Sequence, residues 1–311
     1  MLEPRLRQRI DQKKERLDAL RPLDAGVVAR LREQINLEWI YNSNAIEGNT
    51  LTLQETRLIL ETGLTVGGKS LREHFEVTNH QEAIQYIDSL LEQNVAITPN
   101  LVRQIHKLVL SNIDDDNAGQ YRRTPVRIAG ADHTPPEAWE IPRLMTEWSD
   151  WLNAQQSEIH PVALAALAHH RLVAIHPFID GNGRTARLVM NLSLMRKGYP
   201  PTVIRKIQRK QYYRVLAQAD QDNPEPLVNF VGRNTERSLI LYLEACTPQT
   251  GPKPTDEQWI PLREAAEDVS YSQEYLSLLA RKGRLEAIKR GRNWYTTKKA
   301  VQAYRRSVKE D

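Results

Sequence analysis

The stretch HPFIDGNGRTAR, residues 176–187, brings together side chains that can act jointly on a phosphorylated ligand. His176 can take up a proton near neutral pH, and Asp180 offers the hard carboxylate oxygen that Mg²⁺ prefers. Residues 181–183 read Gly-Asn-Gly where helical periodicity resumes, so their backbone N–H groups are expected to form an anion-binding nest at a helix start. The spacing therefore predicts a proton acceptor, a metal ligand and an anion site on one turn.

Two arginines extend the same pattern. Arg184 and Arg187 are three residues apart and project from one face of the expected helix. Each guanidinium can bind two phosphoryl oxygens, so the pair favours a polyphosphate over a single carboxylate. The segment is not a Walker A loop, because no Lys-Ser or Lys-Thr follows the glycines. A His-Pro pair or a G-x-G alone is typical of an ordinary helix end, whereas the joint pattern indicates nucleotide chemistry.

These residues resemble the hallmark of the Fic family, H-P-F-x-[DE]-G-N-G-R-x-x-R, at every fixed position. The resemblance extends over about residues 30–245 and includes EVTNHQEAI at 76–84 and GQYR at 119–122. It implies an all-α fold, with a Fic-type helical core and a short β-hairpin flap at about 124–136. It also implies transfer of AMP from ATP to a Ser, Thr or Tyr hydroxyl of a target protein, whose segment would pair with the flap by strand addition.

The resemblance assigns roles that agree with the chemistry of the motif. His176 would deprotonate the incoming hydroxyl, Asp180 would hold Mg²⁺, and the two arginines would bind the outer phosphates of ATP. The nest, with Asn182, would stabilise the charge that develops on the α-phosphate. The residues expected to bind the nucleotide are His176, Pro177, Phe178, Ile179, Asp180, Gly181, Asn182, Gly183, Arg184, Arg187, Tyr212 and Tyr213. Phe178 is expected to pack inward, and the two tyrosines either lend a ring to the adenine pocket or pack in the core.

A second motif, SNAIEG at residues 43–48, points to regulation. Ser43 and Glu47 lie one helical turn apart, and Glu47 is placed at a helix C-terminus, where the helix dipole disfavours a negative charge. A cationic partner would explain this placement, and so would a solvated carboxylate. The segment is similar to the inhibitory motif [ST]-x-x-x-E-[GN] of Fic proteins, which implies that Glu47 pairs with Arg187 and blocks the γ-phosphate. The same glutamate can instead position a water for AMP removal.

Helical periodicity dominates the first 250 residues of the 311-residue chain and predicts one large core followed by a smaller module. The expected divisions are an N-terminal helical segment at 1–96 carrying the inhibitory motif, a catalytic core at 97–246, a linker at 247–258, and a C-terminal domain at 259–311. The expected helices end at Gly48, begin at the capping box 52–55, span 72–94 and 98–113, begin at Pro161, resume near Arg184, and span 209–219 and 226–246. Residues 114–136 are expected to form a loop and then a hairpin around Gly130.

Composition excludes several classes of protein. No apolar run approaches the roughly 18–20 residues of a membrane span, and the N-terminus lacks the apolar centre of a signal peptide. Cys246 is the single cysteine, which excludes an intrachain disulfide framework and argues against a zinc site built from cysteines. We therefore expect a cytoplasmic protein without a membrane partner.

The C-terminal module is strongly basic, because residues 281–306 hold ten Lys or Arg and one Glu. Residues 259–306 predict the order helix, turn, helix, hairpin, helix, with the hairpin turn at Gly291 and Arg292. This order resembles the winged helix-turn-helix of excisionase-like domains, which implies that the second helix enters the DNA major groove while the wing, KRGRNW, reaches the backbone. The partner of such a module is DNA or a protein, and a homodimer is also possible.

Three readings of the whole chain remain. The first is a self-inhibited protein adenylyltransferase that uses ATP and Mg²⁺. The second is a DNA-binding regulator whose nucleotide site senses without catalysis. The third is a hydrolase that removes AMP at the same site. An intact His176 argues against a pure sensor, which has no use for a general base, and we favour the first reading.

Overall fold

The structure is a computed structural model, and it describes residues 1–91, 93, 95–128, 132–247, 259–267, 271–291 and 293–307. The chain divides into two compact units, Met1–Thr247 and Pro248–Asp311. Each unit has a hydrophobic core of its own. The expected linker at 247–258 lies, apart from Thr247, outside the described residues.

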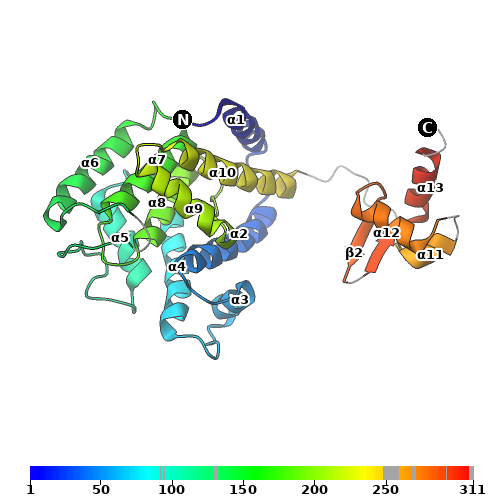
Figure 1. Cartoon of the computed structure of the whole chain (residues 1–311), viewed down its shortest axis with the longest axis horizontal. Helices are drawn as coiled ribbons and strands as arrows, with labels where there is room; N and C mark the ends of the chain where they lie inside the picture. The colour runs from blue at the N-terminus through cyan, green and yellow to red at the C-terminus, as the bar shows by residue number, and fades with distance from the viewer. Residues whose placement is uncertain are drawn as a thin grey trace. The chain divides into compact units, whose positions relative to one another are not determined.

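The N-terminal unit is helical, and its described residues contain no β-strand (Figure 1). Its α-helices are α1 Pro4–Ala19, α2 Ala25–Ile46, α3 Leu53–Thr62, α4 Leu71–Leu91, α5 Pro99–Leu110, α6 Ile141–Ala154, α7 Pro161–Ile175, α8 Asn182–Arg196, α9 Arg209–Ala219 and α10 Glu225–Cys246. Two short 3-10 helices span Ala138–Glu140 and Lys206–Gln208. The all-helical core predicted from the sequence is therefore confirmed.

Local start and stop signals set these helix ends. The hydroxyl of Thr52 accepts the N–H of Glu55 at 3.2 Å, while the Glu55 carboxylate accepts the N–H of Thr52 at 2.7 Å, so the predicted capping box starts α3. Pro161 is the first residue of α7, as predicted. The bounds of α9 coincide with the predicted range 209–219.

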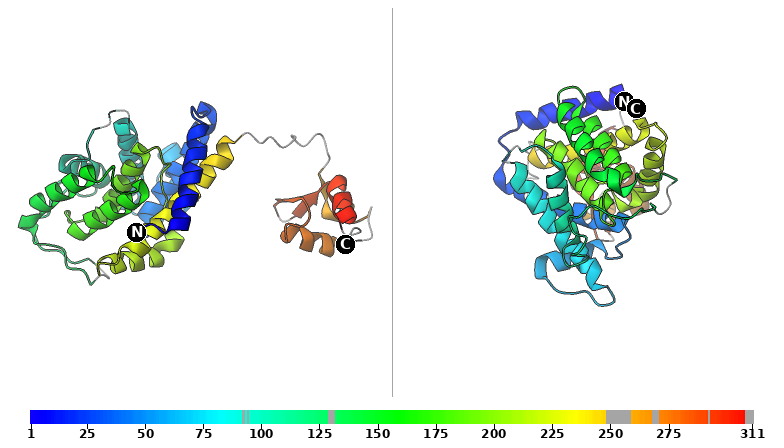
Figure 2. Two further views of the ribbon diagram at one scale, coloured as in Figure 1. Left: turned by 90° about the horizontal axis from the view of Figure 1, so that it is seen from above. Right: turned by 90° about the vertical axis from the view of Figure 1, so that its left-hand side faces the viewer.

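Helix α8 lies in the interior of this unit and packs against α7, α5, α4 and α2 (Figure 1). Most of its residues are buried, which agrees with a sequence that is apolar almost all round. Helix α1 lies along α10 and closes the core on another side (Figure 2). Helix α8 is therefore enclosed by other helices, and the motif at 176–187 spans the turn that enters its N-terminus and the first residues of the helix.

The segment before α6 differs from the expectation. Its described arms, 124–128 and 132–136, form no regular strand, and the expected turn around Gly130 lies outside the described residues. Pro125, Pro135 and Pro136 have no N–H to donate, so these arms can form few of the hydrogen bonds that a hairpin needs. The flap is therefore held by other contacts, which are described below.

The C-terminal unit is built around a three-stranded antiparallel sheet with the order β1-β3-β2. Its elements are β1 Ile260–Pro261, α11 Leu262–Glu267, α12 Gln273–Arg281, β2 Ala287–Arg290, β3 Asn293–Thr296 and α13 Lys298–Ser307. Leu276, Leu279 and Val301 belong to its small core. The predicted order of helix, turn, helix, hairpin and helix is found, with the addition of β1. Arg292, at the tip of the expected wing, lies outside the described residues.

Among the described residues of both units, no helix combines the length and the apolar character that crossing a membrane requires.

Candidate functional site

Two residues in the left-handed backbone region bracket the turn between α7 and α8. His176 ends α7 with φ 49°, and Gly181 precedes α8 with φ 75°. A Cβ at Gly181 would lie 3.3 Å from the ring of His106, so both the backbone angle and the space favour glycine there. The turn thereby brings the start of α8, whose first N–H groups have no partner within the helix, close to Glu47 at the end of α2.

The middle of the turn is fixed by packing. The Phe178 ring is fully buried and stacks on His106 with 3.6 Å between centroids, which confirms that it packs inward. The Asn182 amide accepts the N–H of Phe178 at 3.0 Å and donates to its carbonyl at 2.8 Å. The side chain of Asn182 is therefore occupied within the turn. Its expected role beside the α-phosphate stays a prediction, with its backbone N–H as the group left to provide it.

His106 is a positioning residue that the sequence did not reveal. Its Nδ1 accepts the N–H of Gly119 at 2.9 Å, which leaves Nε2–H to donate to the carbonyl of Asp180 at 2.9 Å. Burial lowers the pKa of His106 to about 4, so the ring is neutral and keeps this tautomer at physiological pH. The Ile179 side chain, by contrast, is 45% exposed and has no visible part in the turn's packing.

His176 is suited to accept a proton. Its Nδ1 is buried in the turn near the backbone of Val173, a contact that raises the pKa of the ring by less than burial lowers it. Burial lowers the pKa of the imidazole below the ordinary value of histidine, and the charge of Arg122 acts in the same direction. The ring is therefore neutral at pH 7, which is the state that a general base requires.

Arg122 ties this turn to the flap. Its guanidinium donates to the carbonyls of His176 at 2.8 Å, Thr124 at 3.1 Å and Pro136 at 2.5 Å. Its backbone N–H donates to the carbonyl of Pro177 at 2.9 Å. Arg122 is buried, so these bonds hold both arms of the flap against the residue proposed as base. The sequence pointed to Arg122 only through the segment GQYR at 119–122, which resembles the family.

Arg187 joins α8 to the C-terminus of α2. Its Nε donates to Ser43 Oγ at 3.0 Å, its Nη2 to the Ser43 carbonyl at 2.8 Å, and its Nη1 to Glu47 Oε1 at 2.6 Å. Burial alone would lower the pKa of Arg187, but the Glu47 carboxylate outweighs it, and the pKa lies above the ordinary arginine value. The structure thus brings together Ser43, Glu47 and Arg187, which the sequence paired only through the family motif.

The Glu47 carboxylate lies against the first turn of α8. A Cβ on Gly183 would be 2.2 Å from Glu47 Oε1, so glycine is required for this approach. An anionic group is therefore placed beside the N–H groups of the predicted nest, where helix dipole and backbone favour negative charge. The site holds a carboxylate where a phosphate was expected.

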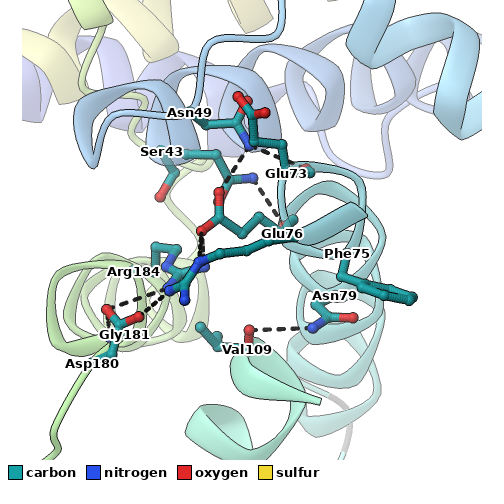
Figure 3. A network of polar contacts seen from close by, with 12 residues as sticks. Ser43, Asn49, Glu73, Phe75, Glu76, Asn79, Val109, Asp180, Gly181 and Arg184 are labelled. Carbon is teal, nitrogen blue, oxygen red and sulfur yellow. Dashed lines mark hydrogen bonds and ion pairs between the residues drawn. The ribbon is translucent and has the colours of Figure 1, made fainter. Parts of the chain in front are cut away.

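Arg184 and Asp180 belong to a separate network (Figure 3). The Arg184 side chain, almost fully buried, lies 3.4 Å from Glu76 Oε1 and 3.6 Å from Asp180 Oδ1. Arg72 on α4 pairs with both acids. Burial works to raise the pKa of Asp180, but Arg184, the Gly181 N–H and Arg72 outweigh it, and the pKa lies below the ordinary value. The carboxylate is ionised, as a cation ligand must be.

The same network joins α4 to the end of α2. Asn44 Nδ2 donates to the carbonyl of Glu76 at 3.0 Å. Asn49 Nδ2 donates to the carbonyl of Glu73 at 3.1 Å and to Glu76 Oε2 at 2.9 Å (Figure 3). The segment carrying Glu47 is therefore linked through Glu76 to Arg184, in addition to its direct pair with Arg187.

The two tyrosines differ in position. Tyr212 is 2% exposed and its hydroxyl is 2.9 Å from His169 Nε2, so its ring belongs to the core and is not open to a base. Tyr213 is 37% exposed, and its hydroxyl lies 3.5 Å from Glu47 Oε2. Of the two rings, Tyr213 alone is exposed, so the expectation of a ring in the adenine pocket stays a prediction for Tyr213. The described residues contain no cluster of three or more His, Cys, Asp or Glu side chains that could hold a metal ion.

Comparison with known proteins gives consistent results. A model of the Fic/DOC family matches residues 96–194. A protein of Drosophila grimshawi named Protein adenylyltransferase Fic is 45% identical over 237 residues, which cover 76% of this chain and 48% of that protein. The chain spans about half the length of the curated relatives it matches.

Two solved structures extend the likeness. A Fic-domain-containing signalling protein from Bacteroides thetaiotaomicron is 32% identical with a TM-score of 0.71, over 76% of this chain and 96% of that one. A Fic family protein from Desulfovibrio desulfuricans has a TM-score of 0.67 over 96% of this chain and 97% of its own, at 23% identity. This second likeness concerns the fold alone. Because Met1–Thr247 is less than 96% of the chain, it extends into the C-terminal unit.

Proposed function

Since the chain belongs to the Fic/DOC family, we propose that its site at 176–187 transfers AMP from ATP to a Ser, Thr or Tyr hydroxyl of a target protein or of the chain itself. The relatives named Protein adenylyltransferase Fic support this reaction. The observation that carries the proposal is the pair of the buried Arg187 with the partly exposed Glu47, which places a carboxylate at the N-terminus of an α-helix. A site that accepts one anion there is suited to a phosphate of ATP.

The proposed chemistry is a displacement at the α-phosphorus. The target oxygen forms a bond to this phosphorus while the bond to the bridging oxygen breaks, and diphosphate leaves. His176 takes the hydroxyl proton. The N–H groups at 181–183 stabilise the added charge on the α-phosphate oxygens, and Arg184 binds the departing phosphates. Asp180 would hold Mg²⁺, which when bound with ATP neutralises phosphate charge.

Glu47 serves as a brake in this proposal. A γ-phosphate bound to Arg187 would have to displace the Glu47 carboxylate, because the guanidinium already donates to Glu47 and to Ser43. Two anions beside one guanidinium repel each other, so ATP binds in an unproductive position until the end of α2 moves. The wild-type chain is therefore expected to have weak basal activity.

The test is labelling of the protein by ATP that carries ³²P at the α-phosphate. Glu47→Gly is expected to raise protein-bound label at least about tenfold, which corresponds to removing roughly 1.4 kcal/mol of competition. Adding His176→Ala to Glu47→Gly is expected to abolish the label. The matched control is Glu61→Gly, which removes an exposed glutamate near the end of α3 and leaves labelling unchanged.

The same variants separate the alternative reactions. If Glu47 positions a water for AMP removal, purified AMP-modified protein loses its label faster with wild type than with Glu47→Gly. If the site only senses nucleotide, all variants bind ATP and none transfers label to protein. Unchanged labelling in folded Glu47→Gly contradicts the brake.

A second function is favoured by one feature of the C-terminal unit. A hollow of about 600 Å³ is lined by Arg263, Arg281 and Lys289, by polar side chains and by Trp294, and none of the described residues that line it is acidic. This combination of cations, amides and an aromatic ring suits nucleic acid, and we propose DNA as its partner. Arg281→Ala with Lys289→Ala is expected to weaken binding to duplex DNA and to reduce its salt dependence. Unchanged affinity in gel-shift titrations would contradict DNA binding through this hollow.

A further inference from the structure

A second hollow lies at the base of the flap in the N-terminal unit. It has a volume of about 480 Å³. Its walls come from the residues directly before the flap arms, from those directly after them, and from α5. The charged and aromatic side chains that line it are those of Arg103, Tyr121, Arg122, Arg123 and Trp139. The hollow is therefore continuous with the segment that is expected to hold the target.

The hollow has a positive lining. Among the described residues that line it, three are arginines and none is Asp or Glu. Arg122 is occupied by its carbonyl partners, and Arg103 donates to the Gly119 carbonyl at 2.7 Å while lying over the ring of Tyr121. Arg123 is exposed and, within the described part of the chain, makes no hydrogen bond or ion pair. Its guanidinium is thus available to a ligand.

Acidic groups on the neighbouring helix do not neutralise this lining. Glu137 and Glu140 follow the flap but are not part of the hollow. Glu140 accepts the N–H of Glu137 at 3.1 Å and lies 3.5 Å from Arg143. Glu137 acts electrostatically on Arg122, the most buried of the three arginines. Neither glutamate forms an ion pair with Arg123, so its positive charge is left for a ligand.

Trp139 supplies an apolar surface beside these charges. It is 78% exposed, which is unusual for a tryptophan in the body of a folded unit. Tryptophan and arginine are the residue types that most often dominate the energetics of protein interfaces. A ligand for this hollow therefore needs carboxylates for the arginines and an apolar side chain for Trp139.

Arg122 connects the hollow to the flap, because it binds Thr124 and Pro136 at the base of the two arms. A target segment lying along the arms would run directly over Arg123 and Trp139. We propose that this hollow binds an acidic segment of the target protein that flanks the modified hydroxyl. The proposal rests on the proposed AMP transfer and names the chemistry by which that site selects its target.

The direct test is peptide binding to the full chain by fluorescence anisotropy at low ionic strength. Two labelled peptides of equal length carry one threonine and one leucine, followed by three glutamates in the first and three lysines in the second. The acidic peptide is expected to bind at least about tenfold more tightly than the basic one, and Arg123→Glu to reverse the order. Trp139→Ala is expected to weaken the acidic peptide severalfold.

The matched control is Arg143→Glu, an exposed arginine on α6 that pairs with Glu140 and Glu147 and does not line the hollow. It is expected to leave the preference unchanged. Equal affinities of the two peptides, no binding of either, or an unaltered preference in Arg123→Glu would overturn the proposal.

A transfer assay distinguishes this failure from failure of the proposed function. The Glu47→Gly variant is incubated with each peptide and ATP labelled at the α-phosphate. Label on both peptides at equal rates overturns the acidic docking surface and leaves AMP transfer standing. Preferential binding of the acidic peptide, with no label on either peptide or on the chain, supports the surface and contradicts the transfer reaction.

Discussion

Glu47 and the first turn of α8 share a very small space. A methyl group on Gly183 would lie 2.2 Å from Glu47 Oε1 and 3.1 Å from Arg187 Nη1. Gly183→Ala is therefore expected to cost about 1–3 kcal/mol of unfolding free energy by overpacking in the wild-type chain. In the Glu47→Gly background the collision is absent, and the cost should fall to less than half. Urea denaturation of the four proteins measures the difference, and equal costs in both backgrounds would contradict the contact.

His176 sets a second prediction at the scale of single residues, on the pH dependence of transfer. Burial lowers its pKa, so the neutral imidazole persists below the ordinary histidine value of about 6.5. Activity is expected to be lost only as pH falls through this lowered pKa, which places the acid limb of kcat/KM for Glu47→Gly below pH 6.5. An acid midpoint at or above 6.5 would contradict it. His170→Gln, which removes a ring paired with Asp220, should leave the limb in place.

At the scale of elements, hydrogen bonds between α4 and the end of α2 are expected to stabilise the inhibitory position of Glu47. Weakening these bonds should therefore raise the rate of label incorporation. Asn49, in the segment that follows α2, donates hydrogen bonds to the Glu73 carbonyl and to the Glu76 carboxylate on α4. Hydrogen bonds of this kind contribute about 1–2 kcal/mol each, so Asn49→Ala should free the end of α2 part of the time. We expect label incorporation to rise severalfold, but less than in Glu47→Gly.

The control for this prediction is Asn153→Ala. The Asn153 side chain donates hydrogen bonds to the carbonyls of Ile97 and Ser149, and these residues lie outside both motifs. It should reduce stability without raising incorporation. If Asn49→Ala folds and labels at the wild-type rate, the link between α4 and the brake has no regulatory effect.

Much of the helical architecture follows from local signals. The capping box at Thr52 and the proline at position 161 fix helix starts because their partners lie within a turn of the same chain segment. The residue types and spacing of the motif at 176–187 likewise predict its chemistry. Other parts depend on distant partners, which no local pattern can indicate. His106 lies 74 residues from the carbonyl it binds, and Arg122 lies 54 residues from His176.

Other details likewise depend on contacts that the sequence alone does not show. Asn182 has a side chain of the right type for a phosphate, but the Phe178 backbone lies closer and takes both of its polar atoms. Tyr212 and Tyr213 are adjacent in the sequence, and helical geometry turns one into the core and the other toward Glu47. The hairpin prediction at 124–136 gave weight to β-prone residues, whereas the prolines remove the N–H groups on which pairing depends.

At the scale of the whole molecule, the two units have separate cores, and all residues of the proposed reaction lie in Met1–Thr247. A chain that ends at Thr247 is therefore expected to bind ATP and, with Glu47→Gly, to incorporate label within about twofold of the full chain. The C-terminal core consists of few residues, such as Leu276 and Leu279, and a unit of this size is only marginally stable.

Scanning calorimetry checks the same division. The full chain should show a main transition that the shortened chain retains at the same temperature, and DNA binding should disappear with the C-terminal unit. The control is the shortened chain with His176→Ala, which should keep the main transition and lose the label. A shortened chain that folds but no longer responds to Glu47→Gly would show that the C-terminal unit takes part in releasing the brake, because none of the contacts of Glu47 and Arg187 described above is removed by the truncation.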